Sequence, residues 1–483
     1  MSKTNVVVIM ADQLRADMLG EDTPNITQIA NEGVKFNRAY CASPLCVPAR
    51  GAFFTGKYPN INGSLINPWF SLDAHHGDVN KDVPNLYRMM EREWDSWHAG
   101  KQHLYTEGGK MENDPNSKTN WIATSATYDK YLKDHNKQRP GGPNFRGRVA
   151  EMTLGKFTRV KDYSIPKTGC YKEGFDTFFD GYFANSAVKA IRKRDKSKPL
   201  LLNAMFLAPH PPLDIPEPWY SMYKEVDVPE NVGKWNADQS PLQMYNLTGI
   251  LGSRYTREDW KDIWPVYKGL VSLLDHCVGM IIDELKVQGI YDETLIIFTS
   301  DHGEMLGSHS LWQKMCMYEE SVRIPLLMKF PSGVDCKGKE IDEVVSAVDV
   351  LPTLCEYLKI EPPKDLSGVS LMTAIAEEPI DREMIYIQFD GNGARGNFQR
   401  CAIMENYKLI IDIFKDEVFL ELYDLGEDVG EQNNLIFEKK YRSIIINMVD
   451  RIREHMKNTE DMLEVSANVY EDFLENYSQL RVK

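Results

Sequence analysis

Long stretches of mostly apolar residues, without strict alternation, mark this chain at four places: residues 6–10, 200–207, 294–300 and 324–329. Such continuous runs are typical of strands that are covered on both faces of a sheet. Segments with helical periodicity lie between them, notably over residues 264–288 and 346–359. Strands that alternate with helices predict an α/β fold with a mostly parallel central sheet flanked by helices.

The pattern near the N-terminus adds smaller elements to this prediction. Residues 23–33 read as a helix that closes on Gly33, and residues 34–39 read as the next strand. Glycine is common where helices end, because it adopts the left-handed backbone conformation at low cost. We expect a further helix over residues 48–55.

The pattern changes after about residue 380, and we therefore predict two domains, a catalytic α/β domain over residues 1–380 and a C-terminal α+β subdomain over residues 381–483. Short strand-like pieces occupy residues 384–388, 400–404, 407–413 and 421–424, and their spacing suggests an antiparallel sheet. A closing helix follows at residues 441–457. The segment 107–177 is polar and only weakly periodic, so we expect an elaborated loop region near the active face.

Composition excludes several classes of protein. The formal net charge of −15 makes nucleic acid an improbable partner, and an anionic substrate needs a local cationic pocket. No apolar run approaches the roughly 18 residues that a spanning helix needs, so we expect no membrane association. The first ten residues read directly into a strand and show no signal peptide, which favours a cytoplasmic protein. The eight cysteines form no regular framework, and we expect most of them to be reduced thiols.

The most specific motif is Cys46-Val47-Pro48-Ala49-Arg50-Gly51-Ala52-Phe53-Phe54-Thr55-Gly56, which fits the pattern C-x-P-x-R-x4-T-G. Pro48 fixes the backbone as the chain leaves the cysteine, and Arg50 brings a permanent positive charge close to it. A purely structural interpretation is that Cys46 is a small buried apolar residue at a strand-to-helix junction. The additional Thr55-Gly56 pair and the segments described next favour a catalytic role instead.

Acidic, basic and imidazole side chains follow the ends of the predicted strands. Asp12-Gln13 and Asp301-His302 each end a strand, where open α/β sheets place their ligands, and a carboxylate there can bind a divalent cation. Gly100-Lys101-Gln102-His103, His210 in Ala208-Pro209-His210-Pro211-Pro212, and Lys314 in Trp312-Gln313-Lys314 are further candidates. Taken singly, each has an ordinary explanation, such as a helix cap for an aspartate or a solvated charge for a lysine. Together they indicate one anion-binding metal site.

These motifs, in this order, resemble the type I sulfatases of the alkaline phosphatase superfamily over nearly the whole chain. Leu422-Tyr423-Asp424-Leu425, with Glu431 and Asn434-Leu435, is similar to a stretch found late in many sulfatases. The resemblance implies an alkaline-phosphatase-like fold and a maturating enzyme that oxidises Cys46 to formylglycine (3-oxoalanine), whose hydrate is the nucleophile. It also implies a divalent cation on Asp12, Gln13, Asp301 and His302.

The resemblance further implies a role for each remaining candidate. Arg50 and His103 would hold the hydrated aldehyde, with His103 as the later base, and His210 would protonate the leaving alkoxide. Lys101 and Lys314 would bind the sulfuryl oxygens, and Asn67 and Tyr105 lie where other substrate contacts could fall. The Asp-Gln and Asp-His pairs look more like the choline-sulfatase and phosphonate monoester hydrolase branches than like sulfatases with Asp-Asp and Asp-Asn. Calcium is the expected ion because the family commonly uses it, with manganese as the alternative because it accepts nitrogen ligands.

Three functions agree with these residues. The leading hypothesis is a sulfuric ester hydrolase that acts on a sulfated sugar or another small organic sulfate. The second is a phosphonate monoester or phosphodiester hydrolase built on the same site, and the third is an inert sulfatase-like binding protein in which Cys46 stays a thiol. Trp69, His75, His76 and the segment 107–177 are expected to shape the choice of leaving group.

Overall fold

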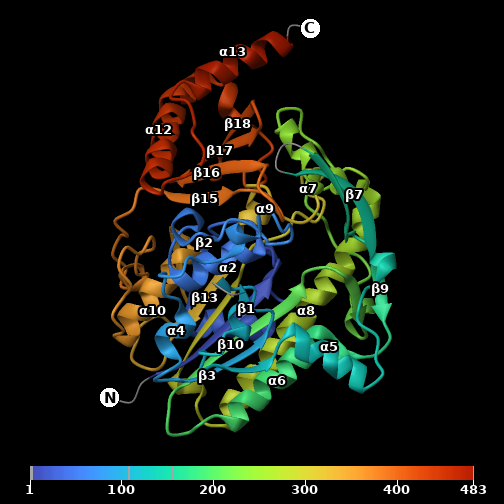
Figure 1. The fold of residues 1–483 in the computed structure, drawn as a ribbon, viewed down its shortest axis with the longest axis vertical. Helices are drawn as coiled ribbons and strands as arrows, with labels where there is room; N and C mark the ends of the chain where they lie inside the picture. Colours follow the sequence, from blue (N-terminus) through green and yellow to red (C-terminus); the bar gives the residue numbers. More distant parts are fainter. Residues whose placement is uncertain (1–3, 107–108, 154–156, 482–483) are drawn as a thin grey trace.

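A central sheet forms the main body of the protein in a computed structural model, which describes residues 4–106, 109–153 and 157–481 (Figure 1). Within those residues the sheet has eight strands in the order β14-β2-β13-β12-β1-β10-β3-β6. Their bounds are β1 Asn5–Asp12, β2 Val34–Tyr40, β3 Asp95–Gly100, β6 Asn120–Ala123, β10 Leu200–Pro209, β12 Thr294–Ser300, β13 Arg323–Lys329 and β14 Lys339–Ser346.

The sheet is mostly parallel, as the apolar runs predict. β12, β1, β10, β3 and β6 are parallel to their neighbours in that order. β13 pairs antiparallel with both β12 and β2, while β14 is parallel to β2. The α/β fold with a mostly parallel central sheet is therefore confirmed, with β13 as the strand of opposite direction.

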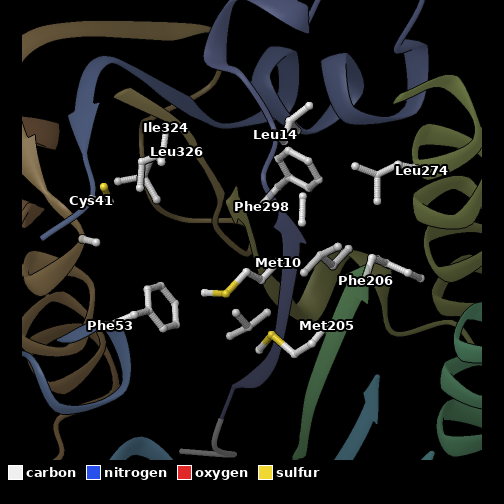
Figure 2. Close-up of a cluster of buried hydrophobic side chains, with 14 of the residues drawn as sticks. Met10, Leu14, Cys41, Phe53, Met205, Phe206, Leu274, Phe298, Ile324 and Leu326 are labelled. Carbon is white, nitrogen blue, oxygen red and sulfur yellow. The ribbon is translucent and has the colours of Figure 1, made fainter. Parts of the chain in front are cut away.

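Helices cover both faces of this sheet. Figure 1 shows α6 (Phe179–Lys193) and α8 (Arg257–Val287) on one side, and α2 (Cys46–Thr55), α4 (Leu86–Met90) and α10 (Val350–Leu358) on the other. Residues 6–10 of β1 have no exposed surface, and Figure 2 shows Met10 at the centre of a cluster that includes Phe53, Phe206 and Phe298. Burial on both faces explains why the central strands are continuously apolar.

Some helix bounds differ from those predicted. α8 begins at Arg257, before residue 264, because Thr256 and Asp259 form a capping box that satisfies its first backbone N–H groups. α1 spans Pro24–Glu32 and ends at Gly33, as predicted. The shorter helices are α3 Pro59–Asn62, α5 Ser125–Asp134, α7 Leu247–Gly252, α9 Glu319–Val322 and α11 Met372–Ile375.

The C-terminal part of the described chain contains a separate antiparallel sheet of four strands. These are β15 Ile385–Phe389, β16 Phe398–Met404, β17 Tyr407–Phe414 and β18 Glu417–Asp424, followed by α12 Arg442–Asn458 and α13 Val469–Arg481. This sheet and its helices enclose an apolar cluster of their own. The predicted smaller α+β unit is thus present, and the boundary at residue 380 stays a prediction.

The segment 107–177 has more regular structure than the sequence suggested, and the expectation of an elaborated loop was wrong in part. It supplies β6, which is the edge strand of the central sheet, and helix α5. It also supplies an antiparallel hairpin of β7 (Arg146–Thr153) and β8 (Phe157–Ser164), and β9 (Thr168–Tyr171), which pairs with β11 (Leu213–Pro216). Another short pair joins β4 (Tyr105–Thr106) to β5 (Gly109–Lys110). These elements lie largely at the surface, so they lack the apolar periodicity that reveals a core element.

None of the helices in the described residues is both long and apolar enough to cross a lipid bilayer. All eight cysteines lie in the described part of the chain, and none of them forms a disulfide.

Candidate active site

Four neighbouring parallel strands carry site residues at their carboxyl ends. In sheet order, Asp301 follows β12, Asp12 ends β1, His210 follows β10 and Lys101 follows β3. Parallel strands bring their carboxyl ends to the same edge of a sheet, which is where ligands bind in open α/β folds. The topology therefore gathers residues that are up to 289 positions apart.

Helix α2 places Cys46 beside these strand ends. The helix begins at Cys46, and all ten of its residues are buried. Its end is set by Gly56, which has φ of 63° and donates its N–H to the carbonyl of Ala52. The Thr55 hydroxyl donates to the carbonyl of Gly51 one turn earlier (2.7 Å). The motif's Thr-Gly pair thus closes the helix, while its cysteine occupies the positive end of the helix dipole.

The Cys46 sulfur lies among ionisable groups from three strands. Its Sγ is 3.2 Å from His302 Nε2, 3.6 Å from Lys101 Nζ and 3.8 Å from Asp12 Oδ1. Cys46 is therefore surrounded by charged and polar groups, and the purely structural interpretation of an apolar residue in a core is excluded. The predicted closeness of residues 12, 46 and 301 is what the structure shows.

Arg50 joins the two carboxylates. Its Nε–H donates to Asp301 Oδ2 (2.9 Å), and its Nη2 donates to Asp12 Oδ2 (3.0 Å). All three side chains are completely buried, and Arg50 also donates to the carbonyl of Lys101. Separating any of these partners would leave an uncompensated buried charge, which is costly. The three side chains are therefore held in one arrangement.

Charge compensation moves several pKa values at this site. Burial acts to raise the pKa of Asp12, but Lys101, which donates to this carboxylate, His210 and Arg50 hold it well below its usual range. Burial and the Asp12 carboxylate act to raise the pKa of the Cys46 thiol. The charges of Lys101, Lys314 and His302 outweigh them and lower that pKa. A residue at position 46 thus lies in a local field that favours negative charge.

Asp12, Cys46, Asp301 and His302 form a group that could hold a metal ion, since one ligand atom from each lies within 4.8 Å of the others. His302 Nδ1 lies 3.0 Å from the carbonyl of Gly303, which can only accept, so Nδ1 carries a proton and Nε2 faces the site. A ligand imidazole oriented by a backbone carbonyl is common around protein-bound metals. The residues present therefore fit a divalent cation.

Gln13, the fourth predicted metal ligand, has its side chain engaged elsewhere in this structure. Its Oε1 accepts from Lys314 Nζ (2.6 Å), and its amide N–H donates to Glu304. Glu304 is a residue that the sequence analysis missed. It is fully buried and also accepts from the backbone N–H groups of Leu306 (3.0 Å) and Gln313 (2.5 Å). Its position, three residues after Asp301 in the same fully buried turn, is the signal that could have revealed it.

The two candidate histidines are half-buried beside the cluster. His103 Nδ1 is buried and has no hydrogen-bond partner among the described residues, so it is available to a bound group. His210 Nδ1 donates to the carbonyl of Pro211 (2.6 Å), which leaves Nε2 as the free nitrogen of the neutral ring. Burial lowers the pKa of both rings, and nearby lysines lower it further.

The backbone is strained around the cluster. Gln13, His103, Gln313 and Met315 have φ of 70°, 48°, 69° and 77°, in the left-handed region that non-glycine residues seldom adopt. Gly100, which precedes Lys101, has φ of 119°, and a Cβ there would lie 1.8 Å from the carbonyl oxygen of Met205. Such strain persists where the surrounding structure fixes it, and it is common at functional sites.

A cavity of about 310 Å³ opens over Cys46. Lys101, His103, His210 and Lys314 line its inner part, and Asn67 lines it too. Asn67 is also held by the Val47 N–H, which donates to its Oδ1 (3.2 Å). Tyr105, His75 and His76 do not line the cavity, although the Tyr105 ring lies 6.3 Å from that of His103. The remaining polar and aromatic lining consists of Trp69, Arg146, Lys161, Asp162, Tyr163, Ser164 and Asn392. Trp69 and the segment 107–177 were predicted to shape the choice of leaving group, whereas Asn392 was missed.

Comparisons with known proteins show the family of this chain. The sulfatase family model matches residues 4–360, and the model of the N-sulphoglucosamine sulphohydrolase C-terminal region matches residues 307–458. An arylsulfatase of Clostridium perfringens is 26% identical, with 92% of each chain covered. An N-acetylglucosamine-6-O-sulfatase of Bacteroides thetaiotaomicron is 25% identical over 95% of this chain and 87% of the relative. A phosphonate monoester hydrolase of Agrobacterium radiobacter has a similar fold, with a TM-score of 0.75, 22% identity and coverage of 95% of this chain and 96% of that one.

The fold is thus that of the alkaline phosphatase superfamily, and the chain belongs to the sulfatase family. Its catalytic class is that of the sulfuric ester hydrolases.

Proposed function

We propose that this protein hydrolyses a sulfate monoester of a saccharide or another small organic alcohol, with a formylglycine at position 46 and a divalent cation beside it. The observation that carries the proposal is the contact of Cys46 with Lys101, His302 and Asp12 at the end of three strands. In this structure the Cys46 sulfur stands in for the oxygen atoms of the hydrated aldehyde. Oxidation by a maturating enzyme would supply that aldehyde, and Asp12, Asp301, His302 and Gln13 would hold the cation, which adds positive charge next to the sulfate.

The chain's own cations would bind and orient the sulfate group. Lys101 and Lys314 line the inner cavity, and each is fixed by a polar partner, Asp12 for Lys101 and Gln13 for Lys314. Fixed donors stabilise developing negative charge without the cost of reorganising water. The local positive field also lets a protein of net charge −15 accept an anion.

His210 would deliver the proton to the departing alkoxide. Because Nδ1 of His210 donates to a backbone carbonyl, only the cationic ring carries a proton on Nε2. A bound sulfate anion in the same cavity would favour that cationic form. His103, whose Nδ1 has no protein partner in the described residues, would act as the base that releases sulfate.

Calcium is the proposed ion, and manganese is the alternative. The carboxylates of Asp12 and Asp301 suit either ion, whereas the imidazole of His302 is a ligand that manganese accepts more readily than calcium. Elemental analysis of protein from the native host would decide between them. Incubation with a chelator, followed by restoration with each ion, should abolish and then recover turnover.

The test of the proposed function combines mass and kinetics. The peptide that contains position 46, isolated from the native host, should be about 18 Da lighter than the cysteine form. The protein should hydrolyse an aryl sulfate, and N-acetylglucosamine 6-sulfate is the first sugar ester to try because a relative is named for it. An unshifted peptide together with no sulfate turnover would refute the proposal.

Phosphonate or phosphate diester hydrolysis on the same site is the second candidate. It is favoured by the fold similarity to a phosphonate monoester hydrolase and by the Asp-Gln and Asp-His pairs. Parallel kinetics on an aryl sulfate, a phosphate diester and a phosphonate ester separate the two functions. Sulfate turnover about 100-fold or more below that of the phosphorus esters would reverse their order.

A further inference from the structure

We infer that the outer part of the same cavity is a second oxyanion subsite centred on Lys161, to which Arg146 adds positive charge, and that the preferred sulfate esters carry a second acidic group. This inference rests on the proposed function, because the inner cations must first hold the sulfate. Both residues belong to the β7–β8 hairpin, and both line the cavity that also contains Cys46. The acidic group would be a carboxylate or a second sulfate, which share the same charge and oxygen acceptors.

The cations of the outer cavity lack the partners that those of the inner cavity have. Lys101 forms an ion pair with Asp12. Among the described residues, no carboxylate lies within ion-pair distance of Lys161 Nζ, and none lies within that distance of the Arg146 guanidinium, which donates to the backbone carbonyl of Asp162 (3.4 Å). Two uncompensated cations at the mouth of an anion-binding cavity would attract an additional negative group.

Lys161 is held in place although it has no acidic partner. Its Nζ lies 4.1 Å from the centre of the Trp69 ring and 5.7 Å from that of Tyr163. Burial, together with the positive charge of Arg159, lowers the pKa of Lys161 to about 8, and Glu151 does not offset these effects. An ammonium group whose charge is disfavoured in this way would gain from an incoming anion.

The nearby carboxylates are engaged with other groups. Glu151 is 5% exposed, accepts from Arg159 Nη2 (3.1 Å) and accepts from the Tyr163 hydroxyl. Asp162 lines the cavity mouth but pairs with Arg148 (3.7 Å), and both side chains are more than half exposed. Neither carboxylate is therefore paired with Lys161, beside which a substrate anion would bind.

Hydrogen bonds fix the hairpin relative to the inner cavity. The backbone carbonyl of Ser164 accepts from Trp312 Nε1 (2.8 Å) and from Gln313 Nε2 (3.3 Å), and these two residues directly precede Lys314. Arg159 Nη2 also donates to the carbonyl of Asn392 (3.3 Å), another residue of the cavity wall. The spacing between the two anion-binding parts is thus determined by the fold, so a ligand that reaches both must match it.

The experiment measures binding of paired arenesulfonates to the matured, metal-loaded enzyme by calorimetry at pH 7. 3-Carboxybenzenesulfonate and 4-carboxybenzenesulfonate are each compared with the matching carbamoylbenzenesulfonate, which has nearly the same shape but one negative charge fewer. We expect one carboxylate isomer to bind about tenfold more tightly than its amide. Benzenedisulfonates then show whether a second sulfo group serves as well as a carboxylate.

Variants on the hairpin and directly after it separate the subsite from general charge effects. Lys161→Met should reduce the carboxylate preference to within about twofold, and Lys161→Arg should retain it. Lys167→Gln is the matched control, because it removes an exposed cation that follows the same hairpin and does not line the cavity, and it should leave the preference unchanged.

Equal affinity of the wild type for the carboxylate and amide compounds would overturn the subsite. It would also be overturned if Lys161→Met weakened binding of both compounds by the same factor. If an aryl sulfate is hydrolysed but the acidic group gives no advantage, the subsite fails and the proposed function stands. Absence of saturable binding of any sulfonate would count against the inner sulfate site, and therefore against both.

Discussion

The inner and outer parts of the cavity differ in the burial and the pairing of their charged side chains. The inner part combines fully buried charges that are paired with one another, as in the Arg50 bridge between Asp12 and Asp301. The outer part contains partly exposed cations on a hairpin, and Lys161 rests on an aromatic ring that is 45% exposed. A buried, mutually paired network has one arrangement, whereas an exposed surface tolerates substitution. Under the proposed function, the inner part would fix the chemistry and the outer part would select the ester.

The largest expected effect comes from Cys46→Ala. It should lower kcat/KM by at least about 10⁴-fold without unfolding the protein, because the nucleophile is lost while the buried volume changes little. Cys41→Ala is the matched control, since Cys41 is a buried cysteine outside the cavity and its variant should stay active. Steady-state kinetics and circular dichroism measure both. Residual turnover of Cys46→Ala within tenfold of the wild type would contradict the assignment.

The inner part also depends on support from the C-terminal sheet. Lys408 of β17 is fully buried between Glu319 (2.8 Å) and Glu431 (2.7 Å), and it donates to the carbonyl of Met317 (2.9 Å), close after Lys314. Lys408→Met should lower the free energy of unfolding by about 3–5 kcal/mol, because it leaves two buried carboxylates uncompensated. Denaturant unfolding gives this value. Arg451→Met on α12, which breaks exposed ion pairs only, should cost less than about 1 kcal/mol.

His210→Ala tests the proton donor of the inner part. The loss in kcat/KM should be about 10²–10³-fold on an alkyl or sugar sulfate, and clearly smaller on a nitrophenyl sulfate, because a good leaving group needs little protonation. A series of aryl sulfates with leaving groups of increasing pKa measures the change in slope. An equal loss across the series would show that His210 only positions the substrate.

Acid sensitivity of the fold should arise partly outside the cavity. Burial and Arg400 lower the pKa of His455 to about 4, with Asp461 acting in the opposite direction. Because the folded pKa lies below the unfolded value, the unfolded state binds more protons, so stability is lost as the pH falls from about 6.5 toward 4. His455→Gln should reduce the stability difference between pH 7 and pH 5 by up to about 2 kcal/mol in denaturant unfolding. An unchanged difference would exclude this source.

The smallest expected effect concerns the outer part. Trp69→Leu removes the ring beneath Lys161, and it should weaken binding of the doubly charged sulfonate by about two- to fivefold, because an exposed cation–π contact contributes about 0.5–1 kcal/mol. Calorimetry with the paired sulfonates measures the change. A larger loss of turnover on a singly charged aryl sulfate would show that Trp69 serves the inner part, which would weaken the division between the two parts.

The sequence by itself determined the parts of the protein whose local pattern is unambiguous. Strands buried on both faces are continuously apolar, so β1, β10, β12 and β13 could be recognised from residue type alone. The fixed spacing of Cys46, Pro48, Arg50 and Gly56 identified the family, because these residues act within one helix and its cap. The residues at the strand ends followed from the same strands.

Only the tertiary structure decided what depends on distant segments. Glu304 and the Gln13–Lys314 contact depend on a turn that brings together residues 301 positions apart. The outer cavity depends on a polar hairpin with no apolar periodicity. The sequence therefore indicated that the segment 107–177 lies near the active face, but neither the hairpin nor the individual residues Lys161 and Arg146 could be predicted. Tyr105 was named with Asn67 as a candidate for substrate contact, but only Asn67 lines the cavity. Local composition therefore specified the proposed catalytic groups, and long-range packing specified which surfaces surround them.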